Sequence, residues 1–273
     1  MKFVSPLLAC LFALIVFSFT PSAPGRKVEP RKDFKSIFDK YLVTGSLMIF
    51  DDSKNVMYVY NEEESKIAVT PASTFKIMNS LIGLETGVAP DETFTLPWDK
   101  KINQNAEWNK DQDMTSAFRN STVWYYQELA RKIGPEKMKL WLDNVQYGNA
   151  DISGGIDAFW LNGGLRISPV EQMEFLINLR EDKLTFSAAT MATVKKIMVD
   201  PLVTNYVLRA KTGWGFENGT NIGWYAGYME IKKKPYYFVN CIKTNDSNNK
   251  AFAAARKDMV IMAMKKLEII PKK

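Results

Sequence analysis

Two groups of predicted β-strands lie near opposite ends of this chain. The first group lies at residues 45–51 and 56–60, where apolar and polar residues alternate on either side of a polar turn. The second group comes after residue 205, at residues 206–211, 221–230 and 236–242. Because both ends supply strands, the pattern predicts an α/β (α+β) fold with one antiparallel sheet built from both termini.

The middle of the chain carries helical patterns instead. Helices are predicted at residues 123–133, 136–143 and 169–180, and a last helix at residues 251–267. We therefore expect a sheet part at about 24–72 and 202–273, and a helical part at about 73–201, which together form one catalytic domain over 24–273. A cleft between the two parts is the natural place for a functional site.

Ser73 and Lys76 form an S-x-x-K element at the start of an apolar helix, in a chain that has no histidine. A serine nucleophile needs a base, and histidine is the usual one. Since residues three apart on a helix share a face, the Lys76 amine can reach the Ser73 hydroxyl. The pair is thus a candidate nucleophile and base.

S-x-x-K is a weak pattern by itself, and the chain contains it a second time. The copy at Ser247–Lys250 lies in a polar run without apolar periodicity and is predicted to be a solvated turn. A serine at a helix start, followed by an exposed lysine one turn later, is the alternative interpretation of Ser73 and Lys76.

The first residues are typical of an export signal. Lys2 precedes an apolar stretch at residues 7–19, and small and turn-forming residues follow at 20–25. We expect residues 1–23 to be removed, which predicts an exported, periplasmic or secreted protein of a bacterium without a stable membrane anchor. Cys10 would leave with this segment, so that Cys241 remains as the single thiol and no internal disulfide forms.

Charge gives little indication of a macromolecular partner. The formal net charge is +6, but 36 basic residues are interspersed with 30 acidic ones. This distribution does not predict nucleic-acid binding, and it favours a modest attraction for small anions. The oligomeric state cannot be predicted, since no exposed apolar face is identifiable.

Four further short elements follow Ser73 in order. They are Ser121-Thr122-Val123 at a helix start, Tyr147-Gly148-Asn149 in a turn, Trp160-Leu161-Asn162-Gly163, and Lys211-Thr212-Gly213 at the end of a predicted strand. In the last element, glycine permits close approach to the backbone, while Lys211 and Thr212 offer a cation and a hydroxyl to an anionic ligand. Each element taken alone has a plainer interpretation: a helix cap for the first, a turn for the second, core packing and a turn for the third, and a polar strand end for the fourth.

The five elements together, in this order behind an export signal, resemble the class D serine β-lactamases, or oxacillinases. The resemblance covers essentially the whole chain after the signal and implies a serine β-lactamase/transpeptidase-like fold. It implies hydrolysis of a small β-lactam substrate through a serine acyl-enzyme, with Ser73 as nucleophile. It also implies that Ser121 passes a proton to the leaving nitrogen while Lys211 polarises that transfer. No metal or organic cofactor is implied.

Related penicillin-recognising enzymes have a polar, S-D-N-like middle element, whereas the third position of that element is Val123 here. The surroundings of Lys76 give a physical reason for this difference. Phe75, Val123 and Trp160 would enclose the amine in apolar surface, which lowers its pKa and leaves it neutral. A neutral amine can act as a base or react with carbon dioxide. The resemblance implies the second outcome: Lys76 is carboxylated on its nitrogen, with Trp160 as hydrogen-bond donor, and serves as base in both half-reactions.

The resemblance also assigns the groups that hold the substrate. The backbone amides of Ser73 and Trp214 would bind the oxyanion, and Thr212, Gly213 and Arg256 would bind the substrate carboxylate. Arg256 is assigned by its place early in the last helix, where Lys257 is a rival. Tyr147 and Asn149 are expected to be mainly structural, and Glu174 is not expected to be catalytic because it lies inside a predicted helix.

Two other functions remain possible. A β-lactam sensor would be acylated at the same serine without turnover, although such receptors resemble these enzymes behind several membrane spans that this chain lacks. A slow cell-wall peptidase is the third possibility. The sequence does not predict which β-lactams are preferred, because that depends on loops near Trp108, Trp214 and Phe216.

Overall fold

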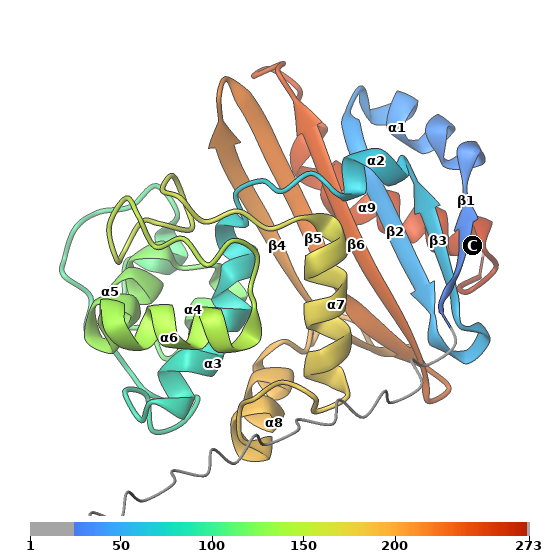
Figure 1. Ribbon diagram of the computed structural model, residues 1–273. Helices are drawn as coiled ribbons and strands as arrows, with labels where there is room; N and C mark the ends of the chain where they lie inside the picture. The colour runs from blue at the N-terminus through green and yellow to red at the C-terminus, as the bar shows by residue number, and fades with distance from the viewer. Residues whose placement is uncertain (1–24, 272–273) are drawn as a thin grey trace, which may run out of the picture.

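A six-stranded sheet joins the two ends of the chain in the computed structural model, which describes residues 25–271 (Figure 1). The strands lie in the order β1-β3-β2-β6-β5-β4, so that β2 from the N-terminal part pairs with β6 from the C-terminal part. Their bounds are β1 Lys27–Pro30, β2 Thr44–Asp51, β3 Val56–Tyr60, β4 Val207–Glu217, β5 Thr220–Ile231 and β6 Lys234–Thr244. The predicted sheet from both termini is confirmed. The export signal predicted at residues 1–23 lies outside the described residues.

One strand departs from the antiparallel pattern. β1 pairs parallel with β3 at the edge of the sheet, whereas every other pair is antiparallel. The sequence reading missed β1 because this edge strand is largely exposed, with Val28 48% exposed, and therefore lacks a buried apolar face.

Helices cover both faces of the sheet (Figure 1). The helical part contributes most of them, and α9 and α1 lie together on the opposite face, where they enclose a second hydrophobic cluster. The α-helices are α1 Lys35–Tyr41, α2 Glu62–Ser65, α3 Lys76–Glu85, α4 Met114–Asn120, α5 Val123–Ile133, α6 Pro135–Val145, α7 Pro169–Arg180, α8 Ala188–Ile197 and α9 Phe252–Lys266. Residues 25–271 also form 3-10 helices, which are η1 Lys32–Phe34, η2 Asp52–Lys54, η3 Ala72–Phe75 and η4 Ala106–Trp108.

The strongly patterned helices agree with the prediction. α7 begins at the predicted cap Ser168, whose hydroxyl accepts from Glu171 N, while the Glu171 carboxylate accepts from Ser168 N. α4 and α8 were not predicted individually. α4 is only seven residues long, so its apolar stripe of Met114, Ala117 and Phe118 is short. The apolar residues of α8 are separated by alanine, threonine and lysine.

Strand β4 corrects the prediction for Lys211-Thr212-Gly213. These residues lie in the middle of a strand that continues to Glu217, not at its end. The chain turns only at Asn218 and Gly219, both of which have positive φ. Gly213 suggested an end of the strand, but here Gly213 and Gly215 permit close packing against the segment before Ser73.

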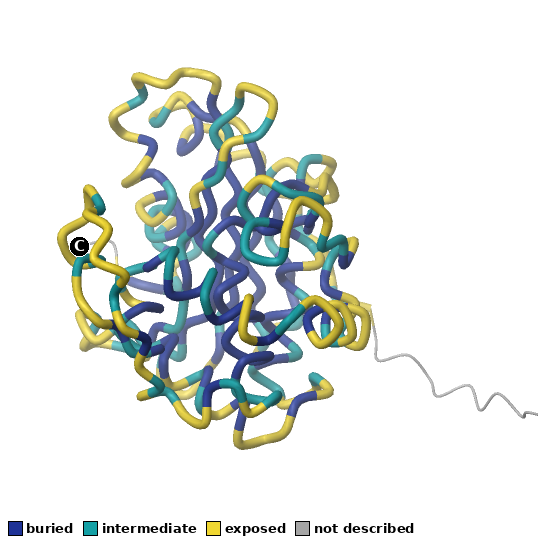
Figure 2. The backbone as a smooth tube through the Cα atoms, turned by 90° about the vertical axis from the view of Figure 1, so that its left-hand side faces the viewer, coloured by how far each residue is buried: buried dark blue, intermediate teal, exposed yellow. Residues whose placement is uncertain are grey.

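The tube in Figure 2 shows buried backbone through the middle of the molecule and exposed loops around it. Cys241 lies in β6, is 2% exposed and is a free thiol. Among residues 25–271, no helix has both the length and the apolar character needed to cross a membrane.

Candidate active site

Ser73 and Lys76 meet where a 3-10 turn continues into a helix. Ser73 lies in η3, and Lys76 is the first residue of α3. The Lys76 side-chain nitrogen hydrogen-bonds to the Ser73 hydroxyl oxygen at 2.9 Å. Lys76 is 1% exposed, so the solvated lysine of the alternative interpretation is not what the structure contains. The second S-x-x-K copy, at Ser247–Lys250, lies in a turn instead.

Burial lowers the pKa of Lys76 well below its ordinary value of 10.5, and the nearby charge of Lys211 lowers it further. No carboxylate forms an ion pair with Lys76 within residues 25–271. The ring centroid of Tyr126 lies 5.2 Å from the lysine nitrogen, within range of a cation–π contact. The sequence reading missed Tyr126, although its position three residues after Val123 on α5 places both on one helix face. The amine is therefore favoured in its neutral form.

Aromatic rings form one wall beside this lysine. Phe75 stacks on Trp160 with ring centroids 5.3 Å apart, and Phe159 meets both rings edge-on. The backbone oxygen of Trp160 accepts from Ala72 N at 3.0 Å, which ties this wall to η3.

Trp160 has a buried donor without an acceptor. Its side chain is 1% exposed, and Nε1 has no hydrogen-bond partner among the described residues. A buried N–H group without a partner is costly, so a bound acceptor is favoured there. A carboxylate formed on the Lys76 nitrogen would supply such an acceptor, and the residues present fit that group.

Ser121 and Val123 lie at the junction of two helices. Ser121 ends α4 in a left-handed conformation with φ of 56°, Thr122 caps α5, and Val123 is its first residue. Val123 is only partly buried, and α5 packs on α3. Within the part of the chain that the structure covers, no hydrogen bond links Ser121 to Ser73, Lys76 or Lys211.

Lys211 is a second buried lysine beside the first. It is 5% exposed, its nitrogen donates to Thr212 O at 3.3 Å, and it lies 5.6 Å from the ring centroid of Phe118. Burial, followed by the charges of Arg256 and Lys257, lowers the pKa of Lys211 to about 7. Phe118 was missed by the sequence reading, and it brings the end of α4, and hence Ser121, toward Lys211.

The K-T-G strand packs closely on the segment before Ser73. A Cβ atom at Gly213 would lie 3.0 Å from Pro71 O, and one at Gly215 would lie 2.7 Å from the Thr70 methyl carbon. A side chain at either position would push η3 away from β4. The two glycines therefore set the distance between the nucleophile and this strand.

The direction of the Trp214 amide follows from the strand pairing. Ala210 N donates to Met198 O on the outer side of β4, away from β5. Because N–H groups of alternate residues point to the same side of a strand, the amide of Trp214 also points outward. β4 is the edge strand, so that this amide is not used in the pairing with β5.

Arg256, not its rival Lys257, contacts the K-T-G glycine. The Arg256 guanidinium donates to Gly213 O at 3.0 Å and lies 5.2 Å from the ring centroid of Trp214. Lys257 instead lies 5.8 Å from the ring centroid of Tyr225. Successive residues of a strand face opposite sides of the sheet, so Thr212 and Lys211 lie on different faces. Thr212 lies on the face that is covered by α9, the helix that carries Arg256.

The remaining elements serve packing. The Tyr147 hydroxyl contacts Gln172 Oε1 at 3.0 Å, and Asn149 Nδ2 donates to Gly164 O at 2.9 Å. The first contact joins the turn after α6 to α7, and the second joins two loops. Glu174 lies inside α7 and pairs with Arg26.

A polar network that was not predicted from the sequence holds the segments around Ser73 and Trp160 together. Glu217 accepts from Arg166 Nε at 2.8 Å and from Thr70 N at 3.2 Å. Arg166 also donates to Gly163 O at 2.7 Å, and Thr70 Oγ1 donates to Trp160 O at 3.0 Å. The end of β4, the segment before Ser73 and the loop that carries Trp160 are thus joined.

The chain is similar to known proteins over most of its length. A family model described as the penicillin binding protein transpeptidase domain matches residues 40–262. The "Probable beta-lactamase YbxI" of Bacillus subtilis is 39% identical over 226 residues, which cover 83% of this chain and 82% of that protein. The crystal structure of a class D β-lactamase from Sebaldella termitidis matches with a TM-score of 0.86 and 40% identity, over 90% of this chain and 100% of that chain.

A receptor domain is also similar. The C-terminal domain of the Bacillus licheniformis BlaR penicillin receptor matches with a TM-score of 0.82 and 32% identity, over 91% of this chain and 100% of that domain.

Proposed function

The chain belongs to the class D serine β-lactamases, and from this we propose that it hydrolyses β-lactams through an acyl-enzyme on Ser73. The observation that carries the proposal is the 2.9 Å hydrogen bond between Ser73 and a buried lysine in a chain without histidine. A neutral Lys76 takes the place of the imidazole that other serine hydrolases use.

In acylation, Ser73 Oγ attacks the β-lactam carbonyl carbon as its proton passes to the base at Lys76. The carbonyl oxygen becomes an oxyanion between the backbone amides of Ser73 and Trp214. The C–N bond of the ring then breaks, and Ser121 passes the proton from the base at Lys76 to the leaving nitrogen, which leaves the base free again. Lys211 in its charged form supports that transfer, because it lies beside Phe118 at the end of the helix that Ser121 terminates.

In deacylation, the same base takes a proton from a water molecule, whose oxygen attacks the ester carbonyl. The bond between the acyl carbon and Ser73 Oγ then breaks, and the base returns the proton to Ser73 Oγ. Carboxylation of Lys76 by carbon dioxide supplies a carboxylate base there, and the unpaired Trp160 N–H is the donor that would hold it. Phe75 keeps the Trp160 indole in place by stacking, and Val123 at the start of α5 helps to exclude water. No metal or organic cofactor takes part.

Arg256 and Thr212 bind the substrate carboxylate. The Arg256 guanidinium already lies against Gly213 and Trp214, which restricts its rotamers before substrate binds. Gly213 leaves the backbone of β4 open to the substrate. The substrate is a small anionic molecule, and the proposal involves no nucleic acid.

Residues 1–23 act as an export signal in this proposal, so that the enzyme works outside the cytoplasmic membrane. Mass spectrometry of the protein recovered from the periplasm or medium tests this, since the mature chain would begin near residue 24. Recovery of the uncleaved chain would contradict it.

The similarity to the BlaR receptor domain supports one alternative, a sensor that is acylated but does not turn over. We distinguish the two by the number of penicillin molecules hydrolysed per protein molecule. Many turnovers support the enzyme. A reaction that stops after one equivalent, with the adduct on Ser73 seen by mass spectrometry, supports the sensor.

A further inference from the structure

A cavity of about 300 Å³ lies beside the K-T-G strand. It is lined by the end of α4, by residues 197–202 at the end of α8 and after it, by residues 210–212 of β4, and by Tyr225 and Lys257. Ser73, Ser121, Trp160 and Arg256 are not among its lining residues. The cavity therefore shares Lys211 and Thr212 with the candidate active site but is otherwise separate from it.

Its wall combines apolar surface with basic groups. The apolar part includes Phe118, Met198, Leu202 and Tyr225. Leu202 is 89% exposed and lies at the rim. The basic groups are Arg119, Lys211 and Lys257. Such a wall matches a ligand with an apolar body and a negative charge.

The basic groups have no carboxylate partners. None of Arg119, Lys211 and Lys257 forms an ion pair with any described residue, although ion pairs are frequent elsewhere on this surface. The one acidic residue in the wall is Asp200, whose carboxylate accepts from Leu202 N at 3.0 Å. The wall thus carries an excess of positive charge.

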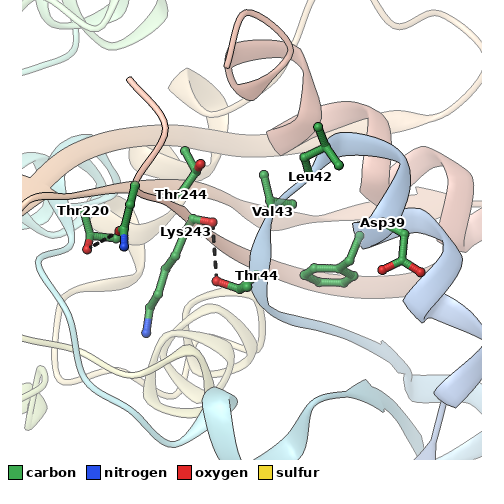
Figure 3. A pocket seen from close by; sticks show the side chains of 9 residues that line it. Asp39, Leu42, Val43, Thr44, Thr220, Lys243 and Thr244 are labelled. Carbon is green, nitrogen blue, oxygen red and sulfur yellow. Dashed lines mark hydrogen bonds between the residues drawn. The ribbon is translucent and has the colours of Figure 1, made fainter. Parts of the chain in front are cut away.

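A larger cavity elsewhere, drawn in Figure 3, has no excess of unpaired positive charge in its wall. It measures about 510 Å³ and lies where the ends of β2 and β6 meet α1, with Lys243 and Asp39 in its wall. Lys243 is paired with Glu64, and Asp39 with Lys35. Because its charges are already compensated, nothing there favours a charged ligand.

We propose that the cavity beside β4 binds a small amphipathic carboxylate, separately from the β-lactam. Its carboxylate would face the basic residues, and its apolar part would lie on Phe118 and Leu202. A volume of about 300 Å³ corresponds to roughly ten water molecules, which suits an aromatic acid the size of benzoate. The inference goes beyond the proposed hydrolysis and does not depend on it.

A bound carboxylate would also favour the protonated form of Lys211. The charge of Lys211 is disfavoured by burial and by neighbouring cations, so an anion in the cavity stabilises the ammonium form. Binding is therefore expected to weaken as pH rises through about 7. The groups that face Lys211 or the cavity are Lys76 of α3, Arg119 of α4, Asp200 after α8, Tyr225 of β5, and Arg256 and Lys257 of α9.

Calorimetric titration at low ionic strength tests the proposal, with benzoate as probe and benzamide as its neutral match. We expect benzoate to bind at pH 6 at least about tenfold more tightly than benzamide, and Lys257→Gln to weaken benzoate about fivefold. The matched control is Lys233→Gln, an exposed lysine in the turn between β5 and β6, which should change the affinity less than twofold. Equal affinities for benzoate and benzamide, or equal effects of the two variants, would overturn the proposal.

A second titration separates this site from the substrate carboxylate site. Ser73→Ala saturated with a penicillin cannot turn it over, so benzoate can be titrated into the occupied protein. We expect benzoate still to bind, with an affinity within about threefold of that of the free protein, because both anions act on Lys211 from different sides. Loss of benzoate binding would place the anion in the position of the substrate carboxylate and refute a separate site, whether or not the wild-type protein is an enzyme.

Discussion

The side-chain nitrogen of Lys76 lies 2.9 Å from the hydroxyl oxygen of Ser73, and the lysine is only 1% exposed. This relationship makes Ser73 the residue whose removal is most informative. Ser73→Ala should lower penicillin hydrolysis by at least about 10³-fold, because the acyl-enzyme cannot form. Steady-state kinetics and mass spectrometry of the adduct measure the loss.

The chain provides a matched control for that variant. Ser247 belongs to the same S-x-x-K pattern but lies in a polar turn, so Ser247→Ala should keep the wild-type rate. If both variants hydrolysed penicillin equally well, the nucleophile would have to be another residue.

The pH profile of kcat/KM should fall on the alkaline side as Lys211 loses its proton. Its pKa in the folded protein is about 7, below the ordinary 10.5, so the charged form is lost as pH rises through that value. Lys211→Arg keeps a positive charge at every accessible pH, and it should reduce the rate but remove this limb. An alkaline limb at the same pH in Lys211→Arg would assign the titration to another group.

Trp160→Phe tests the role of the buried indole N–H. Phenylalanine retains an aromatic ring against Phe75 but cannot donate a hydrogen bond. We expect deacylation to slow by about 10²-fold, so that an initial burst is followed by a slow steady state. Stopped-flow absorbance resolves the two phases.

Trp98→Phe is the control for that substitution, since the Trp98 indole donates to Lys101 O in a surface loop. It should leave both phases unchanged. A Trp160→Phe enzyme with normal deacylation would show that the indole N–H has no part in it.

The pair of Glu217 and Arg166 should contribute to stability. Their side chains are 21% and 28% exposed, and the pair joins β4, Thr70 and the loop before Ile167. Glu217→Gln should lower the free energy of unfolding by about 1 kcal/mol, a value reduced for solvent screening. Urea denaturation measures it.

A double-mutant cycle with Arg166→Gln isolates the pair and should give a coupling of about 0.5 to 1 kcal/mol. Glu107→Gln disrupts a well-exposed pair with Lys110 and should change stability by less than about 0.5 kcal/mol. A coupling of zero between Glu217 and Arg166 would mean that the network is not stabilising.

Local spacing was enough to predict part of the site. The contact between Ser73 and Lys76 follows from the geometry of one helical turn, and Ser168 was predicted to begin α7 because a cap depends on adjacent residues. The general arrangement of the sheet followed from where strand patterns occur.

Contacts between distant segments were not predictable from the residues alone. Tyr126 near Lys76, Phe118 near Lys211 and the interaction of Glu217 with Thr70 depend on how separate elements pack. The preference for Arg256 over Lys257 rests on which face of α9 meets Gly213. The end of β4 was wrongly predicted at Gly213 for the same reason. This glycine makes room for Pro71, a residue that is far away in the sequence.

The central claim is that Lys76 is a neutral amine that becomes the base for both half-reactions. Carbon-13 NMR of the protein in labelled bicarbonate, recorded alongside activity, tests it most directly. We predict a carbamate signal that disappears in Lys76→Ala, and activity that falls in degassed buffer at mildly acid pH and returns with bicarbonate. Full activity without bicarbonate, and without any carbamate signal, would contradict the account.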